Sequence, residues 1–207
     1  DHTYIQVIND AIDPNDWDEI NVNKVKNSFV YSSATDRGLT TLLEMWPQIK
    51  QGLPDATLNV CTPPYSEKWG YEVNMQDGVT WLGALPPKKL YEQISKSEYW
   101  LYPSKYPETY CISALEMMLG GVKICSTNTG NLDSLLNGRG KIVDNGKLEI
   151  DMTREMIDVI FRDNGTCHDD KKFHYEWYKQ TVDNKKWVVE QSWKNRVNEW
   201  LHVMNTL

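Results

Sequence analysis

Two carboxylates eight positions apart, Glu108 and Glu116, have the spacing in this sequence best suited to chemistry. They fall in a unit predicted to be a strand over residues 98–102, a proline-marked loop, a helix over about 109–119 and a strand over 122–126. Strand, crossover helix and strand form the repeating unit of a parallel sheet. Glu108 is therefore expected just before the helix, and Glu116 about two turns further along.

The start of this helix is suited to binding a phosphate, because a helix N-terminus offers unpaired N–H groups and partial positive charge. The amides concerned belong to Thr109, Tyr110, Cys111 and Ile112. Glu108 would lie beside the group that the phosphate carries, and Glu116 would accept hydrogen bonds from vicinal hydroxyls such as those of a ribose. An ordinary explanation stays open, since a Glu at a helix start complements the dipole and a mid-helix Glu usually faces solvent.

The residues around the two carboxylates form a longer pattern, which is Tyr-Pro-Ser, then Pro-Glu-Thr-Tyr-Cys-Ile-Ser-Ala-Leu-Glu, then Gly-Gly-Val. It closely resembles the Glu-x7-Glu region of retaining GT-B glycosyltransferases of family 4. The resemblance implies that Glu108 contacts the donor sugar, that the amides of residues 109–112 bind the diphosphate, and that Glu116 binds the ribose. Ser104, in the matching Pro-Ser pair, joins the expected substrate-binding residues.

A second strand, loop and helix are predicted at residues 28–33, 34–38 and 39–49, where apolar residues recur on one helix face. Ligands of open α/β folds bind at the carboxyl edge of the sheet, where Arg37 can clamp a phosphate, although an ordinary surface arginine is the alternative. The string Ser-Ser-x-x-x-Arg-Gly-Leu, which contains Ser33, Arg37 and Gly38, resembles the family's first phosphate loop. That resemblance implies Arg37 and Glu108 as the catalytic pair, with one of the loop's two usual basic residues replaced by serine.

The remaining pattern predicts an α/β fold with a Rossmann-like parallel sheet flanked by helices. The resemblance implies that this is one half of a GT-B glycosyltransferase. Gly83 and Leu85 lie in a Leu-Gly-Ala-Leu string that resembles the family's base-cradling segment, and a tight strand-to-helix turn would explain it equally well. The other predicted elements are strands over 57–61, 79–82 and 141–143 and helices over 86–95, 153–162, 168–179 and 186–204.

The chain divides into three predicted parts. Residues 1–23 resemble the family's interdomain linker, residues 24–185 the nucleotide-sugar-binding domain, and residues 186–207 a C-terminal helix that packs back on the domain or its partner. The resemblance covers only the donor half, so the acceptor site is expected on an N-terminal GT-B domain or a neighbouring domain of a longer polypeptide.

Composition restricts the partners. With 22 basic and 29 acidic residues and a net charge of −7, the chain is not expected to bind nucleic acid. Four scattered cysteines indicate a cytoplasmic protein without a disulfide framework, and the apolar runs are too short for a transmembrane segment. The four histidines do not cluster, so we expect no metal and no cofactor beyond the donor. The nine tryptophans are expected mainly to pack in the core.

Together these features predict a retaining glycosyltransferase (EC 2.4) that transfers a sugar from a nucleotide-diphosphate sugar to a glycan or another hydroxyl acceptor. The alternative is a non-catalytic nucleotide-sugar-binding module of a larger protein. A dinucleotide oxidoreductase is disfavoured because no Gly-x-Gly-x-x-Gly follows the first strand.

Overall fold

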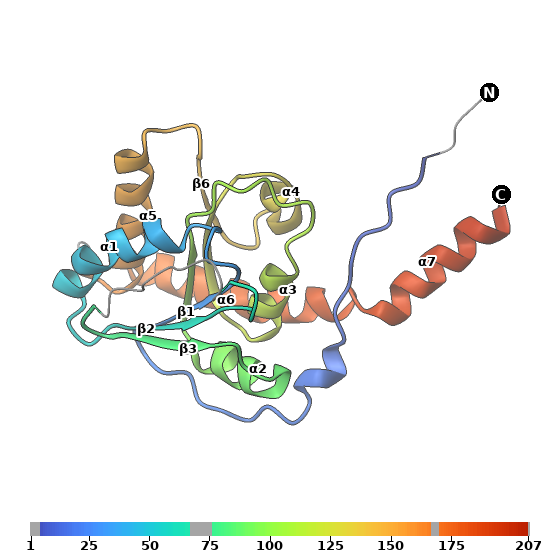
Figure 1. The fold of residues 1–207 in the computed structure, drawn as a ribbon, viewed down its shortest axis with the longest axis horizontal. Helices are drawn as coiled ribbons and strands as arrows, with labels where there is room; N and C mark the ends of the chain where they lie inside the picture. Colours follow the sequence, from blue (N-terminus) through green and yellow to red (C-terminus); the bar gives the residue numbers. More distant parts are fainter. Residues whose placement is uncertain (1–4, 67–75, 167–169, 207) are drawn as a thin grey trace.

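The structure, a computed structural model, describes residues 5–66, 76–166 and 170–206. Six parallel strands form one sheet in the order β3-β2-β1-β4-β5-β6, with helices on both of its faces (Figure 1). This confirms the predicted α/β, Rossmann-like parallel sheet. The strands are β1 (Ser28–Ser32), β2 (Thr57–Cys61), β3 (Val79–Gly83), β4 (Tyr99–Tyr102), β5 (Lys123–Thr127) and β6 (Lys141–Val143). The helices are η1 (Pro14–Trp17), α1 (Leu39–Gly52), α2 (Pro87–Lys96), α3 (Ile112–Leu119), α4 (Leu132–Leu136), α5 (Glu149–Asp163), α6 (Lys171–Val189) and α7 (Trp193–Thr206).

The central strands β1, β4 and β5 are buried along their whole lengths. The apolar residues at the centre of β1 and throughout β4 are typical of strands that are covered by helices on both faces, whereas β5 also buries Lys123, Ser126 and Thr127. The chain adds β2 and β3 on one side of β1 and then returns to place β4 on its other side. Ligands of such sheets bind where the strand order reverses, at the carboxyl ends of the strands. Here that place lies between the loops that follow β1 and β4.

Helix α3 begins at Ile112, three residues later than the sequence predicted, so Thr109, Tyr110 and Cys111 belong to the preceding loop. The reason lies in the loop that follows the neighbouring strand, β5. The amide of Asn131 donates to the carbonyl of Glu108 at 2.8 Å. The Glu108 carbonyl thus bonds to the loop after β5, where a helix that began at residue 109 would use it for its own first bond.

Two further helix boundaries differ from the prediction. Helix α5 begins at Glu149 rather than Thr153, and its acidic first turn suits the positive end of the helix dipole. Helix α6 is continuous to Val189, so the predicted break before Lys186 was wrong, and it crosses the predicted domain boundary there. Its predicted start at His168 lies outside the described residues.

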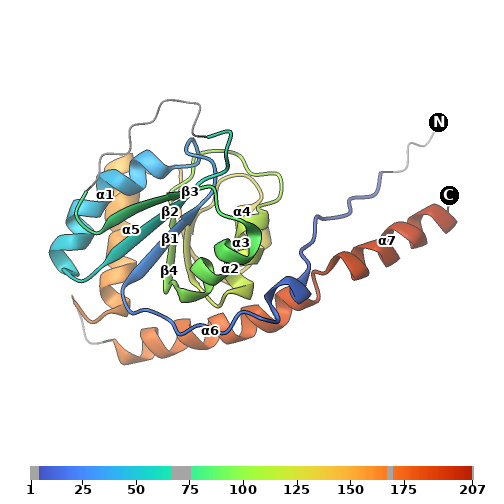
Figure 2. The same ribbon diagram turned by 60° about the horizontal axis from the view of Figure 1, so that its bottom comes forward.

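The actual break, at residues 190–192, is where the N-terminal segment joins the end of the chain. Ile12 accepts a main-chain hydrogen bond from Trp193 at 3.3 Å and donates one to Gln191 at 3.1 Å. The buried Arg196 of α7 adds a contact to the Asp10 carbonyl at 3.4 Å. We call these contacts of Asp10 and Ile12 with Gln191, Trp193 and Arg196 the clasp. Beyond it, α7 extends away from the rest of the molecule (Figures 1 and 2).

Tryptophans occur both in the core and on the exposed surface of α7. Trp46, Trp100 and Trp177 are fully buried, as expected for core packing. Trp193 and Trp200 are instead about half exposed on α7. They belong to an apolar stripe of α7, which consists of Trp193, Val197, Trp200, Leu201 and Met204.

Gly38 allows a close approach that positions the loop after β1. Its φ is +88°, and a Cβ there would lie 2.5 Å from the Pro103 carbonyl oxygen.

Gly138 has a similar φ of +80° with open space around it. We therefore expect Gly138→Ala to lower the free energy of unfolding by about 1 kcal/mol, through backbone strain alone. Gly38→Ala should cost roughly 1–3 kcal/mol more, because it adds a clash. Urea unfolding of both variants measures the difference, and equal losses would contradict the close packing.

Candidate functional site

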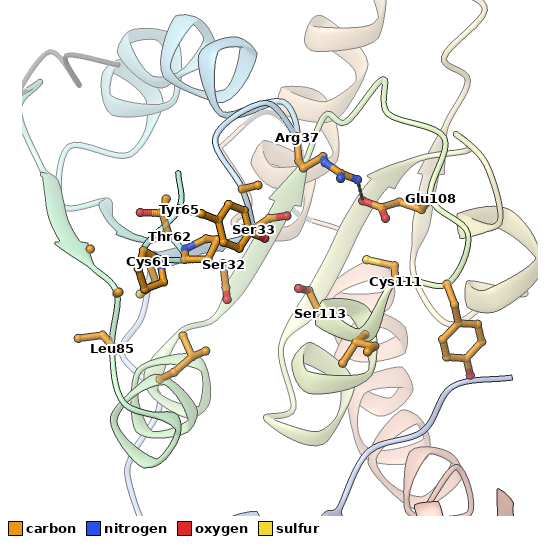
Figure 3. Close-up of a pocket in the computed structure, with 18 residues that line it drawn as sticks. Ser32, Ser33, Arg37, Cys61, Thr62, Tyr65, Leu85, Glu108, Cys111 and Ser113 are labelled. Atoms are coloured by element: carbon orange, nitrogen blue, oxygen red, sulfur yellow. Dashed lines mark hydrogen bonds and ion pairs between the residues drawn. The ribbon is translucent and has the colours of Figure 1, made fainter. Parts of the chain in front are cut away.

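A cavity of about 460 Å³ opens at the carboxyl edge of the sheet, at the reversal between β1 and β4 (Figure 3). Four loops build its wall, and each follows a different strand. The lining residues, grouped by the strand end, loop and helix start to which they belong, are Ser32, Ser33, Ala34 and Arg37 at and after the end of β1, Cys61, Thr62, Pro63, Pro64 and Tyr65 at and after the end of β2, Gly83, Ala84, Leu85 and, in α2, Leu90 at and after the end of β3, and Glu108, Tyr110, Cys111 and, in α3, Ile112 and Ser113 after β4.

Glu108 and Arg37 form an ion pair in the wall of this cavity (Figure 3). The Arg37 Nη1 lies 3.2 Å from Glu108 Oε1, and the Tyr102 hydroxyl donates to the same oxygen at 2.8 Å. The Tyr102 hydroxyl also lies 3.2 Å from the Ser33 hydroxyl. With only 13% of its side chain exposed, Glu108 thus has its charge balanced from two neighbouring strands.

Arg37 is held by contacts on several sides. Its guanidinium packs on the Tyr106 ring, 3.1 Å from the ring centroid, and its Nε lies 3.3 Å from Asp36. Its Nη2 makes no hydrogen bond to any residue that the structure describes. Because a guanidinium carries five N–H donors in a planar fork, Arg37 keeps donors for an anionic ligand while it remains paired with Glu108.

The N-terminus of α3 also faces the cavity, through Cys111, Ile112 and Ser113. None of the described side chains caps this helix start. Burial raises the pKa of Cys111 to about 12, so its thiol is neutral and does not compensate the helix dipole. Free amides and partial positive charge are therefore directed at the same space as Arg37.

Glu116 lies one turn after Ser113 on α3, close enough to Tyr91 of α2 to help, after burial, to raise the pKa of that phenol. Burial raises the pKa of Glu116 itself to about 7. Its carboxylate makes no ion pair or hydrogen bond with any residue described here. A carboxylate that is desolvated without a partner is costly to the fold, and such groups are frequent at ligand sites.

The cavity gathers eight of the predicted site residues, which are Ser33, Arg37, Gly83, Leu85, Glu108, Tyr110, Cys111 and Ile112. Four others are not in its wall. Gly38 packs under Pro103, Thr109 is exposed, and Glu116 lies deeper between α2 and α3. The buried Ser104 holds its own loop, because its hydroxyl accepts from the Tyr106 amide at 3.2 Å. Functional assignments for all twelve stay predictions.

Sequence reasoning missed two parts of the site. The wall formed by residues 62–65 was interpreted only as a loop, although it directly follows a predicted strand, as the other ligand loops do. Tyr102 was interpreted as part of a strand, and nothing in the sequence distinguishes it from the other core aromatics. Burial raises the pKa of Tyr110, and the nearby Arg196 of α7 opposes that rise.

Within the described part of the chain, no three His, Cys, Asp or Glu side chains gather as a metal site would require. The expectation that no metal takes part stays a prediction. None of the helices described is long and apolar enough to cross a membrane.

Solved structures that share this fold are GT-B glycosyltransferases. HepE of Anabaena, in complex with UDP and glucose, matches with a TM-score of 0.69 and 13% identity, over 98% of this chain and 57% of that one. The pneumococcal O-GlcNAc transferase GtfA, in complex with UDP and GlcNAc, matches with a TM-score of 0.61 and 16% identity, over 94% of this chain and 39% of that one. WaaG, a glycosyltransferase involved in lipopolysaccharide biosynthesis, matches with a TM-score of 0.62 and 14% identity, over 92% of this chain and 55% of that one. The fold is that of the C-terminal domain of a GT-B glycosyltransferase.

A sequence profile described as Glycosyl transferases group 1 matches residues 14–177, well over half of the chain. The chain therefore belongs to the glycosyl transferases group 1 family. No curated protein matches it by sequence. The chain spans between 36% and 57% of the lengths of the similar solved structures.

The burial of Glu116 predicts a pH dependence of stability. Its pKa of about 7 in the folded protein exceeds the 4.5 of an exposed Glu, so the folded state binds more protons than the unfolded state between these values. The contribution of Glu116 to the free energy of unfolding is at its maximum below pH 4.5, where the carboxyl is protonated in both states. It is lost as the pH rises through 7. Glu116→Gln should leave stability at pH 4 unchanged and raise the free energy of unfolding at pH 8 by roughly 1–3 kcal/mol.

Chemical unfolding at pH 4 and pH 8 measures this effect. Glu92→Gln on α2 is the control, because a hydrogen bond from Lys89 lowers the pKa of Glu92 and its substitution should give no gain at pH 8. The burial argument is refuted if Glu116→Gln gains nothing over wild type at the higher pH.

Proposed function

We propose that this chain is the donor-binding domain of a retaining, family 4 glycosyltransferase of the Glu-x7-Glu type. It would bind a nucleotide-diphosphate sugar and transfer the sugar, with retention, to a glycan or another hydroxyl acceptor. The observation that carries the proposal is the cavity at the strand reversal, where Arg37, the start of α3 and Glu108 face the same space. A cation, free amides and a carboxylate are the groups that a diphosphate joined to a sugar requires.

In this proposal the donor lies along the cavity wall, and Glu116, which is not in the wall itself, reaches it from the next turn of α3. Arg37 and the amides at the start of α3 bind the diphosphate, and Glu108 accepts hydrogen bonds from the sugar. Glu116 binds the ribose hydroxyls, and the backbone of Gly83 and Leu85 borders the base. HepE and GtfA support this arrangement indirectly, because their structures hold UDP with a sugar.

The proposed chemistry is electrostatic. Negative charge develops on the diphosphate as its bond to the sugar breaks, and Arg37 and the α3 dipole stabilise that charge. Glu108 is already tied to Arg37 and Tyr102, which suits a carboxylate that orients the sugar rather than one that removes a proton. The departing phosphate would take the proton of the acceptor hydroxyl, and the reaction would need no metal.

A partner domain is part of the proposal, because the chain spans between 36% and 57% of the similar structures. We assign the acceptor site to that domain and the apolar stripe of α7 to its contact. The exposed Trp193 and Trp200 are side chains that such an interface would cover. We further assign the protein to the cytoplasm, on the basis of its buried thiols Cys61, Cys111 and Cys125.

Calorimetric titration of this chain with UDP, GDP, ADP and dTDP, and then with their sugar conjugates, tests donor binding. One base series is expected to bind, more tightly as diphosphate than as nucleoside. Transfer is then assayed in the longer polypeptide that includes the acceptor domain. Binding without transfer or donor hydrolysis would favour the non-catalytic module, and no binding at all would overturn both.

The Arg37→Ala variant tests the diphosphate contact. It should weaken binding of the preferred nucleoside diphosphate about 10- to 100-fold and leave the nucleoside unaffected, because a charge-assisted hydrogen bond is worth roughly 1.5–3 kcal/mol. Arg154→Ala is the control, since Arg154 pairs only with Asp151 on the surface of α5. Equal loss for nucleoside and diphosphate would rule out a phosphate contact at Arg37.

The Glu116→Ala variant tests the ribose contact. Loss of its hydrogen bonds should weaken nucleoside diphosphate binding by about 1 to 3 kcal/mol. The same substitution should leave unchanged the affinity for the 2′,3′-dideoxy analogue, which lacks both hydroxyls. If the two ligands lose affinity equally, Glu116 does not contact the ribose.

A further inference from the structure

Glu108 uses only one of its two carboxylate oxygens within the protein. Oε1 accepts both from Arg37, at 3.2 Å, and from Tyr102, at 2.8 Å. No described residue donates to Oε2. Because Glu108 lines the cavity, the free oxygen is the one left to a ligand.

The backbone of Glu108 is fixed by the loop after β5. A Cβ on Gly130 would lie 2.4 Å from the Glu108 nitrogen, and the Asn131 amide donates to the Glu108 carbonyl at 2.8 Å. The main chain therefore has little freedom at this point, and rotation of the Glu108 side chain decides where Oε2 points. The two donors to Oε1 set that rotation.

Tyr102 is the more rigid of these two donors. Its ring is fully buried at the end of β4 and stacks on Trp100, with centroids 4.3 Å apart and planes 19° apart. Arg37 is instead 22% exposed on a loop and is itself needed for the diphosphate. The hydroxyl of Tyr102 is therefore the fixed point from which Glu108 is aligned.

The direction of the hydrogen bonds follows from proton counting. A phenol has one proton, and an ionised carboxylate can only accept, so Tyr102 donates to Glu108. The Tyr102 oxygen must then accept from the Ser33 hydroxyl, 3.2 Å away. Burial raises the pKa of Tyr102 far above its usual value, which keeps that proton in place. Ser33 consequently presents only lone pairs to the cavity.

We propose that Tyr102 is a positioning residue, which acts through Glu108 by holding Oε1 and so directing Oε2 at a hydroxyl of the donor sugar. The Ser33 oxygen, 3.2 Å from the Tyr102 hydroxyl, is a second acceptor in the cavity wall, which suits the hydroxyl-bearing sugar better than the diphosphate. This inference rests on the proposed function and refines it. It predicts that the Tyr102 hydroxyl contributes to binding of the sugar and not to binding of the nucleotide.

Tyr102→Phe tests this directly, since it removes the hydroxyl and keeps the stacked ring. UDP and UDP-glucose are titrated into the wild-type chain and the variant. The affinity for UDP should stay within about twofold, and the affinity for UDP-glucose should fall about tenfold. Tyr99→Phe is the matched control, because it removes a buried hydroxyl bound to Asp163 at the other end of the same strand. It should change neither affinity.

A double-mutant cycle separates positioning from a general effect on folding. If Tyr102 acts through Glu108, Tyr102→Phe should have no further effect on UDP-glucose binding in a Glu108→Ala background. Equal losses of UDP and UDP-glucose affinity, or additive losses in the double variant, would overturn the inference and leave the proposed function standing. If the wild-type chain binds neither UDP nor UDP-glucose, the same pair of titrations is made with GDP, ADP and dTDP and their glucose conjugates. Failure with all of them would overturn both the inference and the proposed function.

Discussion

A carboxylate that is largely withdrawn from water must be compensated, and at Glu108 the compensation comes from two neighbouring strands. Arg37 follows β1, and Tyr102 ends β4. These strands are adjacent at the point where the order of the sheet reverses. The bonds of Arg37 and Tyr102 to Glu108 thus connect the two halves of the sheet at the wall of the cavity. The shape of the site depends on this junction.

Close backbone contacts make the junction possible. Gly38 lets the loop after β1 lie against Pro103, and Gly130 lets the loop after β5 lie against Glu108. Both glycines have positive φ, and side chains at either position would push the loops apart. The parallel sheet delivers these loops to one edge, and the glycines then bring them within hydrogen-bond distance of one another.

The fold was predictable because its main signals are local. The buried strands β1 and β4 contain short apolar runs, and the apolar face of α1 repeats at helical spacing. The errors arose where a distant partner decides the outcome. The start of α3 depends on Asn131, and the break after α6 depends on Ile12, about 180 residues away in the sequence. Tyr102 was missed for the same reason, since only the folded chain places its hydroxyl on Glu108.

One side chain of the clasp between the two ends of the chain, Arg196 of α7, lies near the cavity. Its Nε is 3.4 Å from the Asp10 carbonyl oxygen, and its charge is close enough to Tyr110 in the cavity wall to oppose the rise in pKa that burial gives that phenol. The helix that carries the exposed apolar stripe therefore also carries a side chain near the cavity wall. The surface left open on α7 and the wall of the cavity are thus served by one and the same helix.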